Sequence, residues 1–219
     1  MALDPQIGDP RARGARLPRS ARRAQLLGAA QEVFVANGYH AAAMDEIADR
    51  AGVSKPVLYQ HFPGKLDLYL AILDRHIDEL LAAVRSGLES TTDNKQRVAA
   101  TIGAYFAFVD REDAPFRLVF ESDLTNDPAV RDRVERLERA CAEAIAEVIA
   151  DDTGLPRAES ELLGMALTGM AQVTARYWLQ SGRRIPRSEA ERLAAQLSWR
   201  GIGGFPKHEA QGGTVDATG

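Results

Sequence analysis

Apolar side chains recur every three or four residues along most of the chain, and this period restricts the fold to packed helices. The clearest run lies between residues 65 and 90, and its apolar face consists of Leu66, Leu70, Leu73, Ile77, Leu80, Leu81 and Val84. No segment alternates between apolar and polar residues as a half-buried strand would. The sequence therefore predicts an all-α protein, with helices over about residues 20–37, 44–51, 55–62, 65–90, 94–110, 115–122, 128–151, 156–180 and 188–200.

Residues with special backbone or capping properties stand at the ends of these predicted helices. The expected N-caps are Ser20, Ser54, Asp93, Asp127 and Ser188. Ser188 is followed three residues later by Glu191, which completes a capping-box pattern. Pro56 falls in a first helical turn, where its missing N–H is not needed. Gly38 suits a left-handed position just after the first helix.

The two ends of the chain differ in composition from the helical part. Residues 1–18 and 203–219 carry Pro or Gly without an apolar period, so we expect a disordered basic arm and a disordered tail. Residues 1–65 have a net charge of +3, whereas the rest of the chain has −7. A basic end on an acidic body favours docking of one face on phosphates, and a merely solvated tail is the alternative.

Several classes of protein are disfavoured by the composition. No apolar run approaches the ~18–20 residues that span a bilayer, and the first ten residues lack the apolar core of a signal peptide. The single cysteine, Cys141, excludes an intrachain disulfide. The four histidines fall in different predicted elements at no metal-binding spacing, and no glycine-rich phosphate loop is present. We therefore expect a cytoplasmic protein without a membrane partner, a catalytic site, a metal site or a bound cofactor.

The segment MDEIADRAGVSKPVLYQHFP, residues 44–63, has the pattern of a helix-turn-helix. Its two short helices are too small to be stable alone and must pack across each other. Ala48 is small where the helices cross, and Gly52 can adopt the backbone angles of the tight turn. Ile47 and Leu58 contribute to their shared core. Residues 19–65 are therefore expected to form a DNA-binding domain, and an ordinary helix hairpin is the alternative.

The second short helix of this segment would enter the major groove with its first turn against the base edges. Lys55 can reach guanine, Gln60 can pair with adenine, and Val57 can contact a thymine methyl group. Tyr59, His61 and Lys65 suit phosphate contacts. The full expected DNA-binding set is Arg19, Met44, Ser54, Lys55, Pro56, Val57, Tyr59, Gln60, His61 and Lys65.

Residues 20–73 resemble the DNA-binding domain of the TetR family of regulators. The matching stretches are ANGYH, MDEIADRAGVSK and VLYQHFPGKLDLYLAIL, and LYQHF followed by K-L-D-L is highly specific to this family. The resemblance implies a ligand-binding and dimerisation domain over residues 66–202 and a homodimer on palindromic double-stranded DNA. One difference is that the family usually has Thr just before the first short helix, whereas this chain has Ala42 and Ala43.

Within the family, four stretches are most similar to the fatty-acid-synthesis regulators that respond to long-chain acyl-CoA. These stretches are GYHAAAMDEIADRAGVSKPVLYQHF, STTDNKQR, FRLVFESD and ARYWL. The similarity implies control of lipid-synthesis genes by an apolar effector. A TetR-type repressor of an efflux or catabolic gene, responding to another small apolar molecule, is the alternative.

The predicted C-terminal helices carry many large apolar side chains, as an apolar ligand tunnel would require. The expected ligand-binding residues are Ile102, Phe106, Phe116, Phe120, Leu124, Leu137, Cys141, Met165, Met170, Val173 and Tyr177. For any one of these residues a plain packed core is the alternative. The long helix from Lys65 would join this tunnel to the recognition helix, and we hypothesise that ligand binding tilts it.

Small residues form a stripe along the helix that follows Pro156, and the stripe is expected at a two-fold dimer interface. It consists of Gly164, Thr168, Ala171 and Ala175, and the last helix repeats the pattern with Ala190, Ala194 and Leu197. Packing of the same residues within one chain is the alternative. An enzyme and a structural DNA-binding protein without a ligand are the rival functions.

Overall fold

The structure is a computed structural model that describes residues 17–113, 115–121, 124 and 126–201. The expected basic arm, apart from residues 17 and 18, and the expected C-terminal tail lie outside the described residues. In the described part the chain forms nine helices and no strand, which confirms the all-α prediction. The helices are α1 (Arg19–Ala41), α2 (Met44–Arg50), α3 (Lys55–His61), α4 (Lys65–Glu89), α5 (Asn94–Val109), α6 (Pro115–Phe120), α7 (Pro128–Thr153), α8 (Arg157–Gln180) and α9 (Arg187–Arg200).

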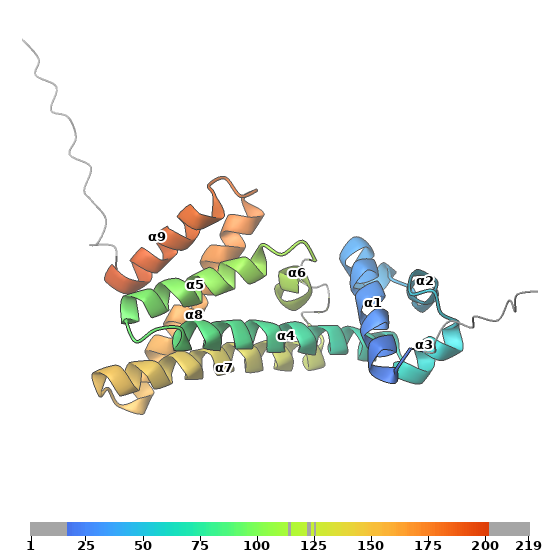
Figure 1. The fold of residues 1–219 in the computed structure, drawn as a ribbon, viewed down its shortest axis with the longest axis horizontal. Coiled ribbons are helices and arrows are strands. Elements are labelled where there is room, and N and C mark those ends of the chain that lie inside the picture. The colour runs from blue at the N-terminus through green and yellow to red at the C-terminus, as the bar shows by residue number, and fades with distance from the viewer. Residues whose placement is uncertain (1–16, 114, 122–123, 125, 202–219) are drawn as a thin grey trace, which may run out of the picture.

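The molecule is elongated, and helix α1 with the short helices α2 and α3 forms one end of it (Figure 1). Helix α4 starts at this end and runs along the rest of the molecule, with α7 beside it and α5 packed over it (Figure 1). Helices α8 and α9 pack against α7 and α5 respectively, and α6 lies between α5 and α1 (Figure 1). We call α1–α3 the reading domain and the remaining helices the ligand domain. Helix α4 joins the two domains.

The reading domain folds around a small apolar core that the sequence period predicts. Leu26 and Phe34 of α1, Ile47 of α2 and Leu58 of α3 are all buried. The chain leaves the regular part of α1 at Gly38, where φ is 76° and a side chain would be strained. This confirms the predicted positive φ at Gly38, although the chain resumes a helical turn as far as Ala41.

The capping predictions hold for the two aspartates but not for the serines. Asp93 accepts a hydrogen bond from the Gln96 N–H, and Asp127 accepts from the N–H groups of two residues that follow it. Helices α1 and α9 begin one residue earlier than expected, after Pro18 and Pro186. Ser20 and Ser188 consequently lie inside these helices, and the predicted caps at both residues are wrong. Pro18 and Pro186 occupy the N-cap positions instead, with extended ψ of 150° and 147°, and a proline side chain offers no capping acceptor.

Ser54 occupies the N-cap position of α3, but its side chain makes no capping hydrogen bond. Ala43 occupies the same position of α2 and offers no side-chain acceptor. The two helices of the helix-turn-helix therefore start without side-chain caps, and tertiary packing supplies their stability.

Helices α7 and α8 approach closely because α8 carries small residues on its inner face. A Cβ atom at Gly164 would lie 2.3 Å from the backbone oxygen of Ala142, so no larger residue fits there. Thr168, Ala171 and Ala175 are also buried within the chain. The expected use of this stripe at a dimer interface is wrong, because the stripe packs inside one subunit.

The opposite side of α8 is apolar and exposed. Leu162, Met165, Val173 and Tyr177 have 71%, 44%, 53% and 69% of their surface accessible. Trp199 of α9 is 46% accessible. Large apolar side chains at helical spacing on one outer surface are typical of a protein–protein contact.

Candidate DNA-binding surface and ligand pocket

The helix-turn-helix places α3 at the outer end of the reading domain (Figure 1). Ala48 of α2 is 1% accessible and lies in the core at the crossing with α3. Gly52 follows α2 with φ of 64°, and the Val53 N–H donates to the Ala48 carbonyl across the turn. The sequence predicted both small residues for this reason.

The predicted DNA-binding residues divide into two groups by exposure. Arg19, Ser54, Lys55, Pro56, Tyr59 and Gln60 are exposed, whereas Met44, Val57, His61 and Lys65 are half-buried. The exposed members on α3 surround its first turn and outer face, while Leu58 points into the core. The outer face of α3 therefore exposes Lys55, Tyr59 and Gln60, and their contacts with DNA stay a prediction.

Lys55 forms an ion pair that sequence reasoning missed. Its Nζ lies 2.6 Å from Oδ2 of Asp45 at the start of α2, and this hydrogen bond raises the pKa of Lys55. Both side chains are largely exposed, so the pair is weak and can exchange for a phosphate. Asp45 would therefore compete with any phosphate that Lys55 contacts.

Replacing Asp45 by Asn should steepen the salt dependence of DNA binding. The freed Lys55 would neutralise one further phosphate, and each such contact adds roughly −0.9 to the slope of log Kobs against log salt concentration. Fluorescence anisotropy with random-sequence DNA at several salt concentrations measures this slope. Asp78→Asn on the exposed side of α4 removes the same charge away from α3. Equal slopes for the two variants would contradict competition by Asp45.

Lys65 is held inside the reading domain. Its ammonium group donates to the backbone oxygens of Tyr39, His40 and Ala42 at 2.8, 3.1 and 2.9 Å, and it also lies over the Tyr39 ring. Three carbonyls occupy the three N–H donors of the ammonium group. The structure therefore gives Lys65 a structural role, since it ties the start of α4 to the end of α1. The expected phosphate contact would require these bonds to break.

A cavity of about 300 Å³ lies in the ligand domain among α4, α5, α7, α8 and α9. Its walls are mainly apolar, and they include Val98, Ile102, Ile145, Val148, Ile149, Leu167 and Trp199. The Thr101 hydroxyl is buried there without a hydrogen-bond partner among the described residues. Arg97 and Asp152 form an ion pair at the same cavity. An apolar space with few polar groups is the usual form of a small-molecule site.

The structure does not bring the expected ligand-binding residues together. Only Ile102 lines the cavity described above, and Phe106 and Tyr177 border a second hollow between α5, α8 and α9. Phe116, Leu124, Leu137 and Cys141 are packed in the core, and Phe120 packs partly buried against them.

The three α8 residues Met165, Val173 and Tyr177 are exposed, so they do not line an internal tunnel of this chain. Met170, also on α8, is half-buried with its sulfur 3.8 Å from the Ser198 hydroxyl. Ile145 and Val148 of α7, which do line the cavity, are absent from the expected set.

Cys141 is a core residue without reactive character. Burial raises the pKa of its thiol to about 12, so the thiolate is scarce at neutral pH. Among the described residues, no group of three or more His, Cys, Asp and Glu is arranged to hold a metal ion. No helix in the described ranges is both long and apolar enough to span a bilayer.

Comparison with known proteins identifies the architecture. Residues 26–72 match the family described as bacterial regulatory proteins, tetR family. Residues 94–201 match the family described as tetracyclin repressor-like, C-terminal domain. The HTH-type transcriptional activator FasR of Mycolicibacterium smegmatis is 48% identical over 194 residues, which cover 89% of each chain. The chain belongs to the TetR family.

Solved structures of TetR regulators share the fold over most of this chain. A tetR-family transcriptional regulator from Streptomyces coelicolor is 31% identical, with a TM-score of 0.69 over 83% of this chain and 80% of the other. FadR from Bacillus subtilis in complex with stearoyl-CoA has a TM-score of 0.69 at 18% identity, over 82% of this chain and 98% of the other. The protein is therefore a TetR-type transcriptional regulator, a class of DNA-binding proteins that are not enzymes.

Proposed function

We propose that this TetR regulator binds palindromic operator DNA as a homodimer and controls fatty-acid or lipid synthesis genes in response to a long-chain acyl-CoA or a similar apolar ligand. The observation that carries the proposal is the apolar cavity of about 300 Å³ bordered by five helices of the ligand domain. A mainly apolar hollow with few polar groups is the usual form of a small-molecule site, and a purely structural DNA-binding protein does not require one.

The relatives support the same class of effector. FasR aligns along nearly the whole chain, and a fatty acid metabolism regulator protein of Bacillus subtilis is 26% identical over 85 residues. The FadR structure that shares this fold contains stearoyl-CoA. We propose that this protein binds a ligand of the same class, and a direct binding experiment tests this.

The size of the cavity suggests how an effector would act. About 300 Å³ is at the small end of the range for ligand sites. A long acyl chain would therefore displace neighbouring side chains and helices as it enters. Each buried methylene contributes roughly 0.8 kcal/mol, so the chain supplies enough free energy to move a helix. The ligand alters DNA binding only if the two shapes of the protein differ in affinity for it.

Stearoyl-CoA should raise the melting temperature of the protein. At a ligand concentration of 100 Kd the stabilisation is about 2.7 kcal/mol. For a chain of this size that corresponds to a rise of roughly 5–10 °C in a thermal-shift assay. Coenzyme A without an acyl chain should cause little shift, because it lacks the apolar part that the cavity would accept.

Val98→Trp provides the matched variant, since Val98 lines the cavity and the larger ring would fill it. We expect this variant to fold and to lose the shift with stearoyl-CoA. An equal shift for both proteins would locate the ligand elsewhere. No shift for the unchanged protein at saturating ligand would refute a long-chain acyl-CoA as the effector.

A further inference from the structure

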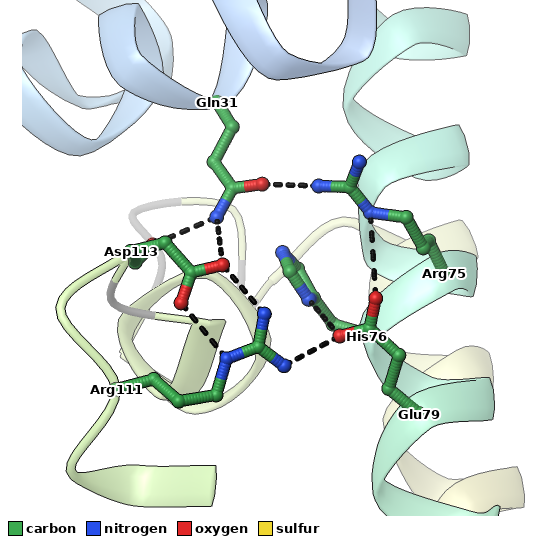
Figure 2. A network of polar contacts seen from close by, with 6 residues as sticks. All are labelled: Gln31, Arg75, His76, Glu79, Arg111 and Asp113. Atoms are coloured by element: carbon green, nitrogen blue, oxygen red, sulfur yellow. Dashed lines mark hydrogen bonds and ion pairs between the residues drawn. The ribbon is translucent and has the colours of Figure 1, made fainter. Parts of the chain in front are cut away.

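A polar network joins the reading domain to the ligand domain at a place away from the cavity (Figure 2). It contains Gln31 of α1, three residues of α4, and two residues of the corner between α5 and α6. The α4 residues are Arg75, His76 and Glu79, and the corner residues are Arg111 and Asp113. Gln31 is its one member from the reading domain.

Gln31 bridges the two other elements with its amide. The amide nitrogen donates to the backbone oxygen of Asp113 at 2.8 Å and to its carboxylate at 3.2 Å. The amide oxygen accepts a hydrogen bond from Arg75 (Figure 2). Gln31 is 5% accessible, so the loss of these partners would leave a buried amide unsatisfied. The side chain therefore depends on the present position of the corner.

The corner is in turn held to α4 by charge. Arg111 makes two bonds to the Asp113 carboxylate, at 2.9 and 2.6 Å, and a third to Glu79 at 2.6 Å. Glu79 also lies 3.0 Å from Nδ1 of the fully buried His76. The four charged side chains alternate in sign and are each partly accessible, so every single ion pair is weak. Such contacts specify one arrangement and still exchange readily.

Helix α5 connects this network to the cavity. Val98, Thr101 and Ile102 of this helix line the cavity, and its last residue, Val109, lies two residues before Arg111. Sixteen residues of α-helix act as one rigid rod of about 24 Å. Movement of the cavity wall would therefore move the corner as well.

We propose that the contact between Gln31 and Asp113 is the tether through which α5 sets the position of the reading domain. The tether holds the two domains in the arrangement described here, and an effector that displaces α5 separates Asp113 from Gln31. This last step rests on the effector site proposed above. The tether itself does not depend on that site, because its effect on the position of the reading domain exists without a ligand.

The direct test is the distance between the two reading domains of the dimer in Gln31→Leu. A spin label on Ala36→Cys reports this distance by pulsed electron resonance, because Ala36 is exposed on α1 while the native Cys141 is buried. We expect the distance distribution to shift or broaden in Gln31→Leu without any ligand. Gln180→Leu is the matched control, since Gln180 of α8 also donates to a carboxylate, that of Glu121, and both residues lie outside α1.

An unchanged distribution in Gln31→Leu would overturn the proposal and leave the network a purely stabilising one. Arg111→Gln is a second variant, which releases the corner from Glu79 and should shift the distribution in the same direction. Should Gln31→Leu fail to fold, an unchanged distribution in Arg111→Gln would overturn the proposal equally.

A second experiment tests the tether and the proposed effector separately. It measures the factor by which stearoyl-CoA changes the affinity of the protein for operator DNA. For the unchanged protein we expect a factor of roughly 5–150, the usual range for two coupled sites. The Gln31→Leu protein should still bind stearoyl-CoA, but the ligand should leave its operator affinity almost unchanged, with a factor close to one. If stearoyl-CoA changed the operator affinity of the Gln31→Leu protein as much as that of the unchanged protein, coupling through the tether would be contradicted. If stearoyl-CoA does not bind the unchanged protein, the proposed effector is wrong. The distance between the spin labels still tests the tether in that case, because it is measured without a ligand.

Discussion

Replacing Val173 by Asp should produce a monomer that has lost specific operator binding. Val173 lies near the middle of the exposed apolar face of α8, between Met165 and Tyr177, and is 53% accessible in the single subunit. In a two-fold dimer the same face of each subunit takes part, so one substitution introduces two buried carboxylates. A buried charge without a partner strongly opposes association.

The loss of the dimer should have a large effect on DNA binding. A single α3 makes contacts with one half-site only, and specific sites usually bind 10³–10⁷-fold more tightly than random DNA. We expect operator affinity to fall by at least roughly 100-fold and to approach that for random DNA. Sedimentation velocity measures the oligomeric state, and fluorescence anisotropy measures the affinity.

Ala99→Asp is the control for Val173→Asp, because Ala99 is an exposed residue of α5 that lies outside the apolar face. This variant should remain a dimer with ordinary operator affinity. A dimer that survives in Val173→Asp would show that the subunits associate through another surface.

Gly164→Ala should be among the most destabilising single-methyl additions in the ligand domain. The new Cβ would lie 2.3 Å from the Ala142 oxygen and 3.2 Å from the Ala146 nitrogen, both in the backbone of α7. Backbone atoms in a packed helix cannot turn aside as a flexible side chain can, so the two helices must separate. Overpacking of this kind costs about 3 kcal/mol. The melting temperature should fall by roughly 6–12 °C.

Gly103→Ala is the matched control in the same domain. Its Cβ would have Glu191 Oε2 at 4.0 Å as its nearest neighbour, and α5 is regular at this position. Removing a helical glycine without a clash stabilises by roughly 0.5–1 kcal/mol. Thermal denaturation of both variants should therefore give shifts of opposite sign. A Gly164→Ala protein as stable as Gly103→Ala would refute the close approach of α7 and α8.

Local patterns predicted most of the fold because they depend on neighbours in sequence. Asp93 and Asp127 cap the helices that follow them, since a capping oxygen and its N–H partners are two or three residues apart. Gly38 and Gly52 adopt the positive φ that a helix end and a tight turn require. The serine caps failed at Ser20 and Ser188, where the preceding Pro18 and Pro186 occupy the N-cap positions.

The ligand and dimer residues were harder to predict because helix α8 has two apolar faces. The apolar period of the sequence shows that α8 has one face of small residues and one of large residues. It does not show which of the two is turned toward the core. Contact with α7 decides this, because only the small face lets the backbones approach at Gly164. Large residues such as Val173 and Tyr177 are consequently left outside, not in a tunnel.

The amino-acid sequence by itself determined the helices, the helix-turn-helix and the exposed face of α3, because each depends on spacing within a few residues. Only the tertiary structure decided the partner of Lys65, the bridge made by Gln31, and the space beside Ile102. Lys65 meets Tyr39 across 26 residues and Gln31 meets Asp113 across 82, while the cavity is bounded by five helices at once. Such contacts are fixed by how whole helices pack, and no local period in the sequence specifies that.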